Sequence, residues 1–199
     1  MILNLVINRV YTIYFNIIYK KSFKGFGKQS RIIFPLNING FNNISIGRDV
    51  YVAYKSWLSA LPLTGEKNCE LIIGDGTSIG NFNHIYATKS VVIGKKVLTA
   101  DRVYISDNLH SFEDINIPII DQPIKQIKIV EIGDGTWLGE NVCVIGAKIG
   151  KNCVVGANSV VTKDVPDYCV AVGSPAYIIK RFCTNNNIWK KTDKRGDFV

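Results

Sequence analysis

An aliphatic residue followed by glycine recurs every six residues through much of this chain. The spacing appears in residues 73–85, 132–142 and 149–161. Short repeats of this kind are typical of parallel β-helices, in which each hexad is one short strand and a turn that cannot bury its apolar side alone. The pattern predicts stacked coils with the aliphatic residue pointing inward and a small or β-branched residue, such as Thr77 or Val97, four positions later. Glycine is expected at corners whose conformation a Cβ would disfavour.

The same pattern disfavours two common architectures. An amphipathic helix needs apolar positions at three- and four-residue spacing, and a glycine in its interior would cost roughly 1 kcal/mol each time. A β-sandwich would show strict two-residue alternation, with turn signals about every eight to twelve residues. The chain shows neither pattern, so we expect an all-β solenoid.

Residues 2–20 differ from the repeats, because apolar side chains recur there at helical spacing. We expect an amphipathic helix followed by a basic loop, together forming residues 1–32. Two roles stay open for the helix. It could cap the open first coil, as terminal repeats require, or it could rest on the inner face of a membrane. It lacks the features of a signal peptide and is too polar to span a bilayer comfortably.

The repeats are expected to form one domain, residues 33–175, with two interruptions. One contains Asn68, and the longer one is an extruded loop over residues 107–129. Long loops on rigid scaffolds commonly carry function, so the second interruption is the first place to look for a site. Residues 176–199 are expected to form a short basic helix, beginning at Tyr177–Phe182, and a basic tail.

Positive charge is concentrated at the two ends of the chain. Residues 1–48 contain seven Lys/Arg and no acid, residues 49–179 contain 11 basic and 14 acidic groups, and residues 180–199 contain six basic and two acidic groups. Basic ends suit an anionic membrane surface or a phosphate-rich cofactor. No nucleic-acid-binding motif is visible, so no nucleic acid partner is expected. The five cysteines lack paired metal spacing and are expected to be free thiols in a reducing cytoplasm.

The chain has two histidines, His84 and His110. A zinc site like that of the γ-class carbonic anhydrases needs three histidine ligands, so we expect no catalytic metal. His110 lies in the long loop, where an accessible imidazole could take a proton from a hydroxyl or an amine. Asp107 could orient that imidazole or cap a turn. His84 is expected to be a structural or subunit-interface residue.

Five features occur in a fixed order along the chain. They are the hexads of residues 73–105 and 132–165, the run Ile105–His110, the run Gly135–Gly139, the run Gly156–Asp164 and the ending Gly173–Ala176. Together they resemble the hexapeptide-repeat acyltransferases over about residues 70–182. The chain is similar to the galactoside and maltose O-acetyltransferases, and more so to the O-acetyltransferases of lipopolysaccharide and capsule gene clusters. The resemblance implies a left-handed parallel β-helix assembled as a homotrimer, with acetyl-CoA in a groove between subunits.

The resemblance also implies roles for individual residues. His110 matches the general base, and Asn81 matches the asparagine that holds the acceptor sugar, although Asn83 is a second candidate. The backbone amide of Glu140 matches the group that stabilises the thioester oxyanion, and Trp137 matches a residue beside the thioester arm. The residues that match the pantetheine, nucleotide and phosphate end are Ala157, Thr162, Lys163, Lys180 and Arg181.

Other readings of these residues stay open. Trp137 could be a wall of the trimer interface, and Lys163 and Lys180 could be ordinary solvated charges. One coil also departs from the family pattern, because residues 144–149 are one residue short and lack the usual Pro-Gly.

The activity that the resemblance implies is direct transfer of an acetyl group from acetyl-CoA to a sugar hydroxyl, in lipopolysaccharide, O-antigen, capsule or exopolysaccharide biosynthesis. The alternative in the same class is N-acetylation of an amino sugar or of a xenobiotic. The alternative in another class is a non-catalytic β-helical scaffold. The acceptor loop would distinguish the first two, and the sequence identifies neither the sugar nor the hydroxyl. The expected location is cytoplasmic, at the inner face of the membrane if the helix rests there.

Overall fold

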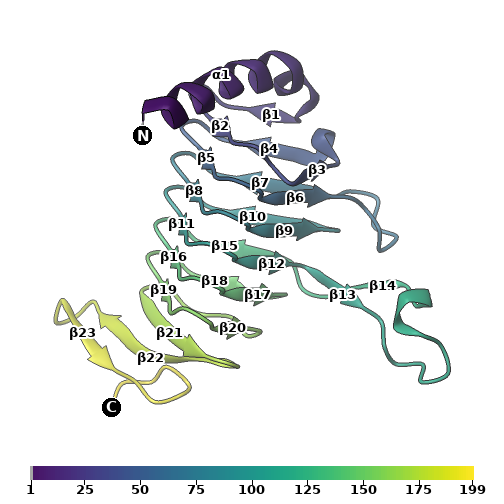
Figure 1. The fold of residues 1–199 in the computed structure, drawn as a ribbon. Coiled ribbons are helices and arrows are strands. Elements are labelled where there is room, and N and C mark those ends of the chain that lie inside the picture. The colour runs from purple at the N-terminus through teal and green to yellow at the C-terminus, as the bar shows by residue number, and fades with distance from the viewer. Residues whose placement is uncertain (1) are drawn as a thin grey trace.

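The computed structural model of the protein describes residues 2–199. Its body is a parallel β-helix of stacked three-sided coils, with one α-helix across the first end and a β-hairpin at the last (Figure 1). A long arm leaves the stack part-way along it. None of the described helices has the length and apolarity of a membrane-spanning segment.

Each side of the stack is one sheet. The first comprises β1 (Gly25–Phe26), β4 (Ile44–Ile46), β7 (Glu70–Ile73), β10 (Ser90–Ile93), β15 (Val130–Ile132) and β18 (Lys148–Ile149). The second comprises β2 (Arg31–Ile32), β5 (Tyr51–Val52), β8 (Ser78–Ile79), β11 (Leu98–Thr99), β16 (Trp137–Leu138), β19 (Val154–Val155), β21 (Cys169–Gly173), β22 (Ala176–Cys183) and β23 (Ile188–Lys191). The third comprises β3 (Asn37–Asn39), β6 (Trp57–Ala60), β9 (His84–Ala87), β12 (Tyr104–Ser106), β17 (Cys143–Ile145) and β20 (Val160–Val161). We call these sheets A, B and C.

The six-residue pattern is confirmed as the core of the stack. In sheet A the hexad isoleucines lie one above another, with Ile73 paired to Ile93 and Ile93 paired to Ile132. All three are buried, and so are Thr77 and Val97 four positions after the hexad starts. The coils therefore bury together an apolar side that none could bury alone.

Glycine is needed in the hexads for two reasons. Gly76 and Gly135 occupy left-handed corners between sheets A and B, each with φ of 70°, as expected, and the glycine after each hexad isoleucine has a second role. Gly74 has no left-handed backbone conformation, but a Cβ there would lie 2.6 Å from the carbonyl carbon of Gly94 in the next coil. The left-handed corner positions between sheets B and C are instead occupied by Phe82, Arg102 and Asn141, with φ of 55°, 56° and 56°. The glycine thus allows close approach of the coils.

Two corner details complete the stack. The coil that is one residue short turns at Gly146, whose φ is 55°. Aspartates at other corners accept a backbone N–H from the preceding coil, as Asp75 does from Arg48 at 2.8 Å and Asp134 does from Lys95 at 2.7 Å. The hydrogen bond from the Arg48 amide is the main reason that the pKa of Asp75 lies below its ordinary value.

The predicted N-terminal helix is confirmed as α1 (Ile2–Tyr19), followed by a 3₁₀ turn, η1 (Lys20–Ser22). It covers the first coil, with Phe15 buried in the core and Tyr11 stacked on Phe34 at 3.8 Å between ring centroids. The capping role is therefore present. The solenoid begins before residue 33, because β1 and β2 already pair with strands of the second coil. The 3₁₀ turn η2 (Phe41–Asn43) lies between β3 and β4.

The expectation of a helix after residue 176 is wrong. Strand β22 pairs antiparallel with β21, and β23 pairs antiparallel with β22. The last strand of the solenoid would otherwise leave a row of backbone N–H and C=O groups unpaired, and the hairpin satisfies them. The β-branched and aromatic residues of Tyr177–Phe182 also favour a strand.

Candidate active site

The predicted extruded loop is an arm built on a two-stranded ribbon. Strand β13 (Asn108–His110) pairs antiparallel with β14 (Ile124–Gln126), and a 3₁₀ turn, η3 (Ile119–Asp121), lies near the tip. The arm leaves the corner between sheets C and A (Figure 1). His110 ends β13 opposite Ile124, so the ribbon fixes its backbone.

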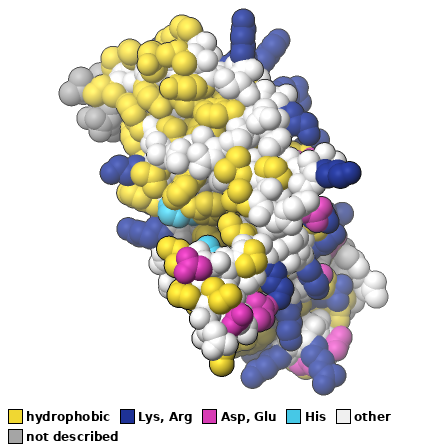
Figure 2. Space-filling view, turned by 90° about the vertical axis from the view of Figure 1, so that its right-hand side faces the viewer, with side chains coloured by type: hydrophobic (Ala, Val, Ile, Leu, Met, Phe, Trp, Pro, Cys, Tyr) yellow, Lys and Arg dark blue, Asp and Glu magenta, His cyan; other side chains and the backbone are white. Residues whose placement is uncertain are grey.

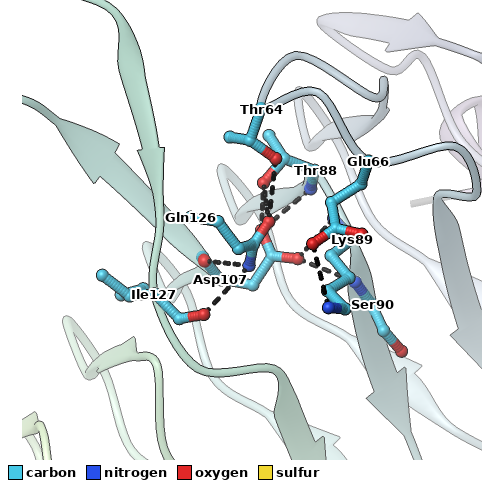
Figure 3. A network of polar contacts seen from close by, with 8 residues as sticks. All are labelled: Thr64, Glu66, Thr88, Lys89, Ser90, Asp107, Gln126 and Ile127. Atoms are coloured by element: carbon cyan, nitrogen blue, oxygen red, sulfur yellow. Dashed lines mark hydrogen bonds and ion pairs between the residues drawn. The ribbon is translucent and has the colours of Figure 1, made fainter.

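Asp107 anchors the arm to the solenoid (Figure 3). Its buried carboxylate accepts the backbone N–H groups of Thr88, Lys89 and Ser90, each at 2.8 Å. It also accepts the Thr88 hydroxyl and the Asn108 side-chain amide at 3.0 Å. These contacts are those of a turn cap. Among the described residues, the hydrogen-bond partners of the Asp107 carboxylate do not include His110. Of the two roles left open for Asp107, these contacts favour the turn cap, which positions the arm, over orientation of the His110 imidazole.

Gln126 ties the arm to the first interruption of the solenoid. Its amide nitrogen donates to the carbonyl of Asp107 at 2.7 Å, and its amide oxygen accepts the hydroxyls of Thr88 at 2.9 Å and Thr64 at 3.0 Å (Figure 3). Thr64 belongs to the loop between β6 and β7, which includes Asn68 as expected. Both interruptions of the repeat therefore meet at one corner.

The arm overhangs a cavity of about 400 Å³ on sheet C. His110 lines it from the arm and His84 lines it from β9. Figure 2 shows both histidines on the same face of the molecule, next to hydrophobic side chains. A larger hollow, of about 1110 Å³, lies beside the first interruption and contains no histidine. The smaller cavity is the one that combines shape with proton-transfer groups.

Aromatic side chains form the floor of this cavity. The ring centroids of Trp57 and Tyr86 lie 5.1 Å apart, and those of Tyr86 and Tyr104 lie 6.0 Å apart. Burial is the main factor that raises the pKa of Tyr86 to about 12, so its phenol is a hydrogen-bond donor at neutral pH. The indole N–H of Trp57 has no acceptor among the described residues. The floor thus combines flat apolar surface with the phenol of Tyr86, whereas the Trp57 N–H is itself buried.

A second group of predicted residues lies on sheet B, away from this cavity. Trp137 is 47% exposed and pairs in register with Val154, which pairs with Val170, which pairs with Lys180. These side chains form one column on the outer face of the sheet. Lys180 is therefore about three strand spacings, roughly 14 Å, from Trp137.

The corner between sheets B and C holds three more predicted residues. The Asn81 side chain donates to Asp101 at 3.1 Å and accepts the Tyr54 N–H at 3.2 Å, so its polar groups are paired within the chain. Glu140 and Ala157 occupy the same corner in later coils, where the Asn158 N–H donates to the Glu140 carbonyl at 2.8 Å. The Glu140 N–H has no acceptor among the described residues, because Ala157 lacks the carboxylate that Asp101 supplies to Asn81.

The remaining predicted residues separate further. Thr162 and Lys163 follow β20 at the corner between sheets C and A, which is the corner that carries the arm. Arg181 pairs with the buried Cys169, one position from Lys180, so the two basic side chains leave opposite faces of β22. One chain therefore brings His110, Thr162 and Lys163 to one side of the prism. It places Trp137, Glu140, Ala157, Asn81 and Lys180 on another.

Comparisons with known proteins agree with this fold. Residues 129–163 match the family model described as the hexapeptide repeat of succinyl-transferase. The putative lipopolysaccharide biosynthesis O-acetyl transferase WbbJ of Escherichia coli K12 is 34% identical over 174 residues, which cover 83% of this chain and 86% of that protein. The chain belongs to the hexapeptide-repeat acyltransferases.

Two further comparisons set the limits of the likeness. A probable acetyltransferase of Mycobacterium tuberculosis, Rv3034c, is 39% identical over 69% of this chain, which spans only 44% of that relative. The crystal structure of AntD, an N-acyltransferase from Bacillus cereus in complex with dTDP and 3-hydroxybutyryl-CoA, aligns with a TM-score of 0.69 at 22% identity, over 81% of this acyltransferase and 85% of that chain. The expected left-handed parallel β-helix is confirmed.

Sequence reasoning missed part of the cavity of this acyltransferase. His84 was expected to be a structural or subunit-interface residue, and the structure places it in the same cavity as His110. Trp57, Tyr86 and Tyr104 line the cavity as well. The signal was available in the register, because Trp57 and His84 hold equivalent outward positions of successive coils, as His84 and Tyr104 do.

Proposed function

We propose that this acyltransferase transfers the acetyl group of acetyl-CoA to a hydroxyl of a sugar, within lipopolysaccharide, O-antigen, capsule or exopolysaccharide biosynthesis. The observation that carries the proposal is the cavity under the arm, which places His110 above an aromatic floor. Aromatic rings suit the apolar faces of sugar rings, while Tyr86 and His84 supply polar partners for hydroxyls. The name of the Escherichia coli relative supports the same pathway class.

In the proposed mechanism His110 takes the proton of the acceptor hydroxyl as its oxygen attacks the thioester carbonyl. The C–O bond forms, the C–S bond breaks, and the CoA sulfur leaves with a proton returned from the imidazole. The N–H of Glu140 is suited to stabilise the oxyanion, because it has no competing acceptor among residues 2–199. A covalent thiol intermediate is not needed. No cysteine lines the cavity, and burial raises the pKa of Cys69 to about 12 and of Cys169 to about 11.

The outer face of sheet B fits acetyl-CoA. Trp137 offers an exposed ring for the pantetheine arm, and the small Ala157 leaves the neighbouring corner open. Lys180 stands in the same column, where its ammonium group can meet phosphates. Thr162 and Lys163 would approach the cofactor from the other side of the groove. Arg181 leaves the opposite face of β22 from Lys180 and so is not placed to meet the same phosphates.

Lys180 and Arg181 can be tested separately because they leave opposite faces of β22. We expect Lys180→Ala to raise the Michaelis constant for acetyl-CoA about fivefold to tenfold, the loss of one charge-assisted hydrogen bond. A short acetyl thioester without the nucleotide should show no such change. Arg181→Ala is the matched control, and steady-state kinetics with both donors makes the comparison. An equal effect of Lys180→Ala on both donors would contradict its phosphate role.

The separation of the two residue groups supports a homotrimer. His110 on one side of a chain would meet Trp137 and Glu140 on the side of a neighbouring chain, so each site would need two copies. Mixing His110→Ala chains with Glu140→Pro chains, which lack the oxyanion N–H, should restore some activity, since some interfaces would then combine two intact sides. Light scattering gives the oligomeric state. A fully active monomer would rule out this arrangement.

The direct test of the activity is an acetyl-transfer assay with purified protein, acetyl-CoA and a panel of neutral sugars and amino sugars. Each sugar is offered free, as its nucleotide derivative and in lipid-linked form. Release of free CoA thiol and mass spectrometry of the product report the reaction. The O-ester product is cleaved by mild alkali and an N-acetyl product is not. Turnover only with amino sugars would favour N-acylation, the activity named for the AntD structure. Acetyl-CoA that neither raises the melting temperature nor reacts would favour a non-catalytic scaffold.

Five free cysteines fit a cytoplasmic location.

A further inference from the structure

The outward face of α1 is apolar from Val6 onward. The exposed side chains on it are Val6, Ile7, Val10, Ile13, Tyr14, Ile17 and Ile18. Ile17 is 75% exposed and Val10 is 62% exposed. These positions recur at three- and four-residue spacing, so they form one stripe along the helix. Figure 2 shows hydrophobic side chains gathered at the upper end of the molecule, where α1 lies in Figure 1.

The inner face of the same helix carries its short polar side chains. The Tyr54 hydroxyl donates to the Asn8 side chain, and the Thr12 hydroxyl donates to the Asn8 carbonyl at 2.8 Å. Asn16 is half-buried on the same side. A surface helix of a soluble protein normally turns its polar residues to water. Here the outer stripe is large, apolar and contiguous, which marks an interaction surface.

The charges near the stripe are mostly positive, although the exposed Asp49 shares a hollow with Arg9 and Ile13. Residues 1–48 contain seven Lys/Arg and no acid. Arg9 is the only charged residue of α1, and the exposed Lys20 and Lys21 follow the helix directly. Lys28 is exposed in the next loop. An apolar stripe with a positive margin complements an anionic lipid surface, whereas packing the same face of two copies together would bring like charges into contact.

We infer that α1 and the basic segment 20–28 dock this acyltransferase on an anionic phospholipid surface. The helix lies in the plane of the lipid headgroups with its stripe in the acyl boundary, and the lysines meet the phosphates. Because α1 crosses the end of the solenoid, the coils extend away from the lipid (Figure 1). The inference does not depend on which acceptor the enzyme uses.

The test is co-sedimentation of the full chain with phosphatidylcholine vesicles that contain, or lack, phosphatidylglycerol. We expect binding to the anionic vesicles that weakens as salt is raised. The triple variant Val10→Ser, Ile13→Ser, Ile17→Ser should lose roughly tenfold or more in affinity. Lys20→Gln with Lys21→Gln should lose about fivefold per lysine.

The matched control is Ile115→Ser with Ile120→Ser in the arm, whose side chains are 93% and 85% exposed. It removes exposed apolar surface elsewhere and should bind vesicles like the wild type. Melting temperature and turnover on a soluble acceptor should stay unchanged in all α1 variants. Absence of binding to anionic vesicles at low salt would overturn the inference. Equal binding by the triple variant would overturn it too, as would a triple variant that changes only the oligomeric state.

Discussion

Replacing His110 with alanine is expected to lower the turnover number of acetyl transfer by about 10²- to 10⁴-fold, the usual contribution of general base catalysis. His110 lines the cavity from the arm, whereas Trp137 and Lys180, which we propose hold acetyl-CoA, lie on sheet B. The dissociation constant for acetyl-CoA should therefore stay nearly unchanged. Steady-state kinetics and calorimetric titration of acetyl-CoA measure the two quantities.

His84→Ala is the matched control, because its imidazole lines the same cavity from β9. We expect a much smaller loss of turnover and a higher Michaelis constant for the acceptor, since we propose that His84 holds the sugar. Added imidazole should partly restore His110→Ala and leave His84→Ala unchanged. Equal, severe losses in both variants would mean that the base is misassigned.

Replacing Asp107 with alanine is expected to destabilise the protein by about 3 kcal/mol or more, because buried donors lose their acceptor. The three backbone N–H groups of Thr88, Lys89 and Ser90 all depend on this carboxylate. For a chain of this size the melting temperature should fall by roughly 6–12 °C. Thermal unfolding followed by circular dichroism measures the change.

Asp75→Ala is the control for this prediction, because Asp75 also caps a backbone N–H but lies on an exposed corner with a surface ion pair to Arg48. Its loss should lower the melting temperature far less than the loss of Asp107 does. At temperatures where Asp107→Ala is folded, its turnover should still be reduced with acetyl-CoA affinity intact, since the arm that carries His110 has lost its anchor. Asp107→Asn, which keeps one acceptor oxygen, should recover part of both losses. An Asp107→Ala variant that melts and turns over like the wild type would contradict the anchoring role.

The sequence by itself determined the solenoid and its appendages. Aliphatic residues at six-residue spacing can share a core only by stacking, which is why the columns through Ile73 and Ile93 could be expected before the structure. The helix over residues 2–20 and the arm at 107–129 also followed from the pattern, since one has helical spacing and the other has none. The failed expectation was the C-terminal helix. The β-branched and aromatic residues there favour a strand, but the partner that makes the strand stable, the edge strand β21, is known only from the fold.

Only the tertiary structure decided how the candidate site is assembled. His84 and His110 are far apart in the repeat pattern, and the arm folding over sheet C brings them to one cavity. Adjacent in sequence, Lys180 and Arg181 separate because a strand alternates its side chains. The role of Asp107 was ambiguous in the sequence, because a carboxylate near a histidine can orient the imidazole or cap a turn. The structure shows that it accepts three backbone N–H groups of the preceding coil, which is the pattern of a cap. Such contacts depend on which residues of neighbouring coils lie side by side at the corners. The hexad pattern specifies that the coils stack, but it does not specify the conformations of the corner loops or the contacts between their side chains.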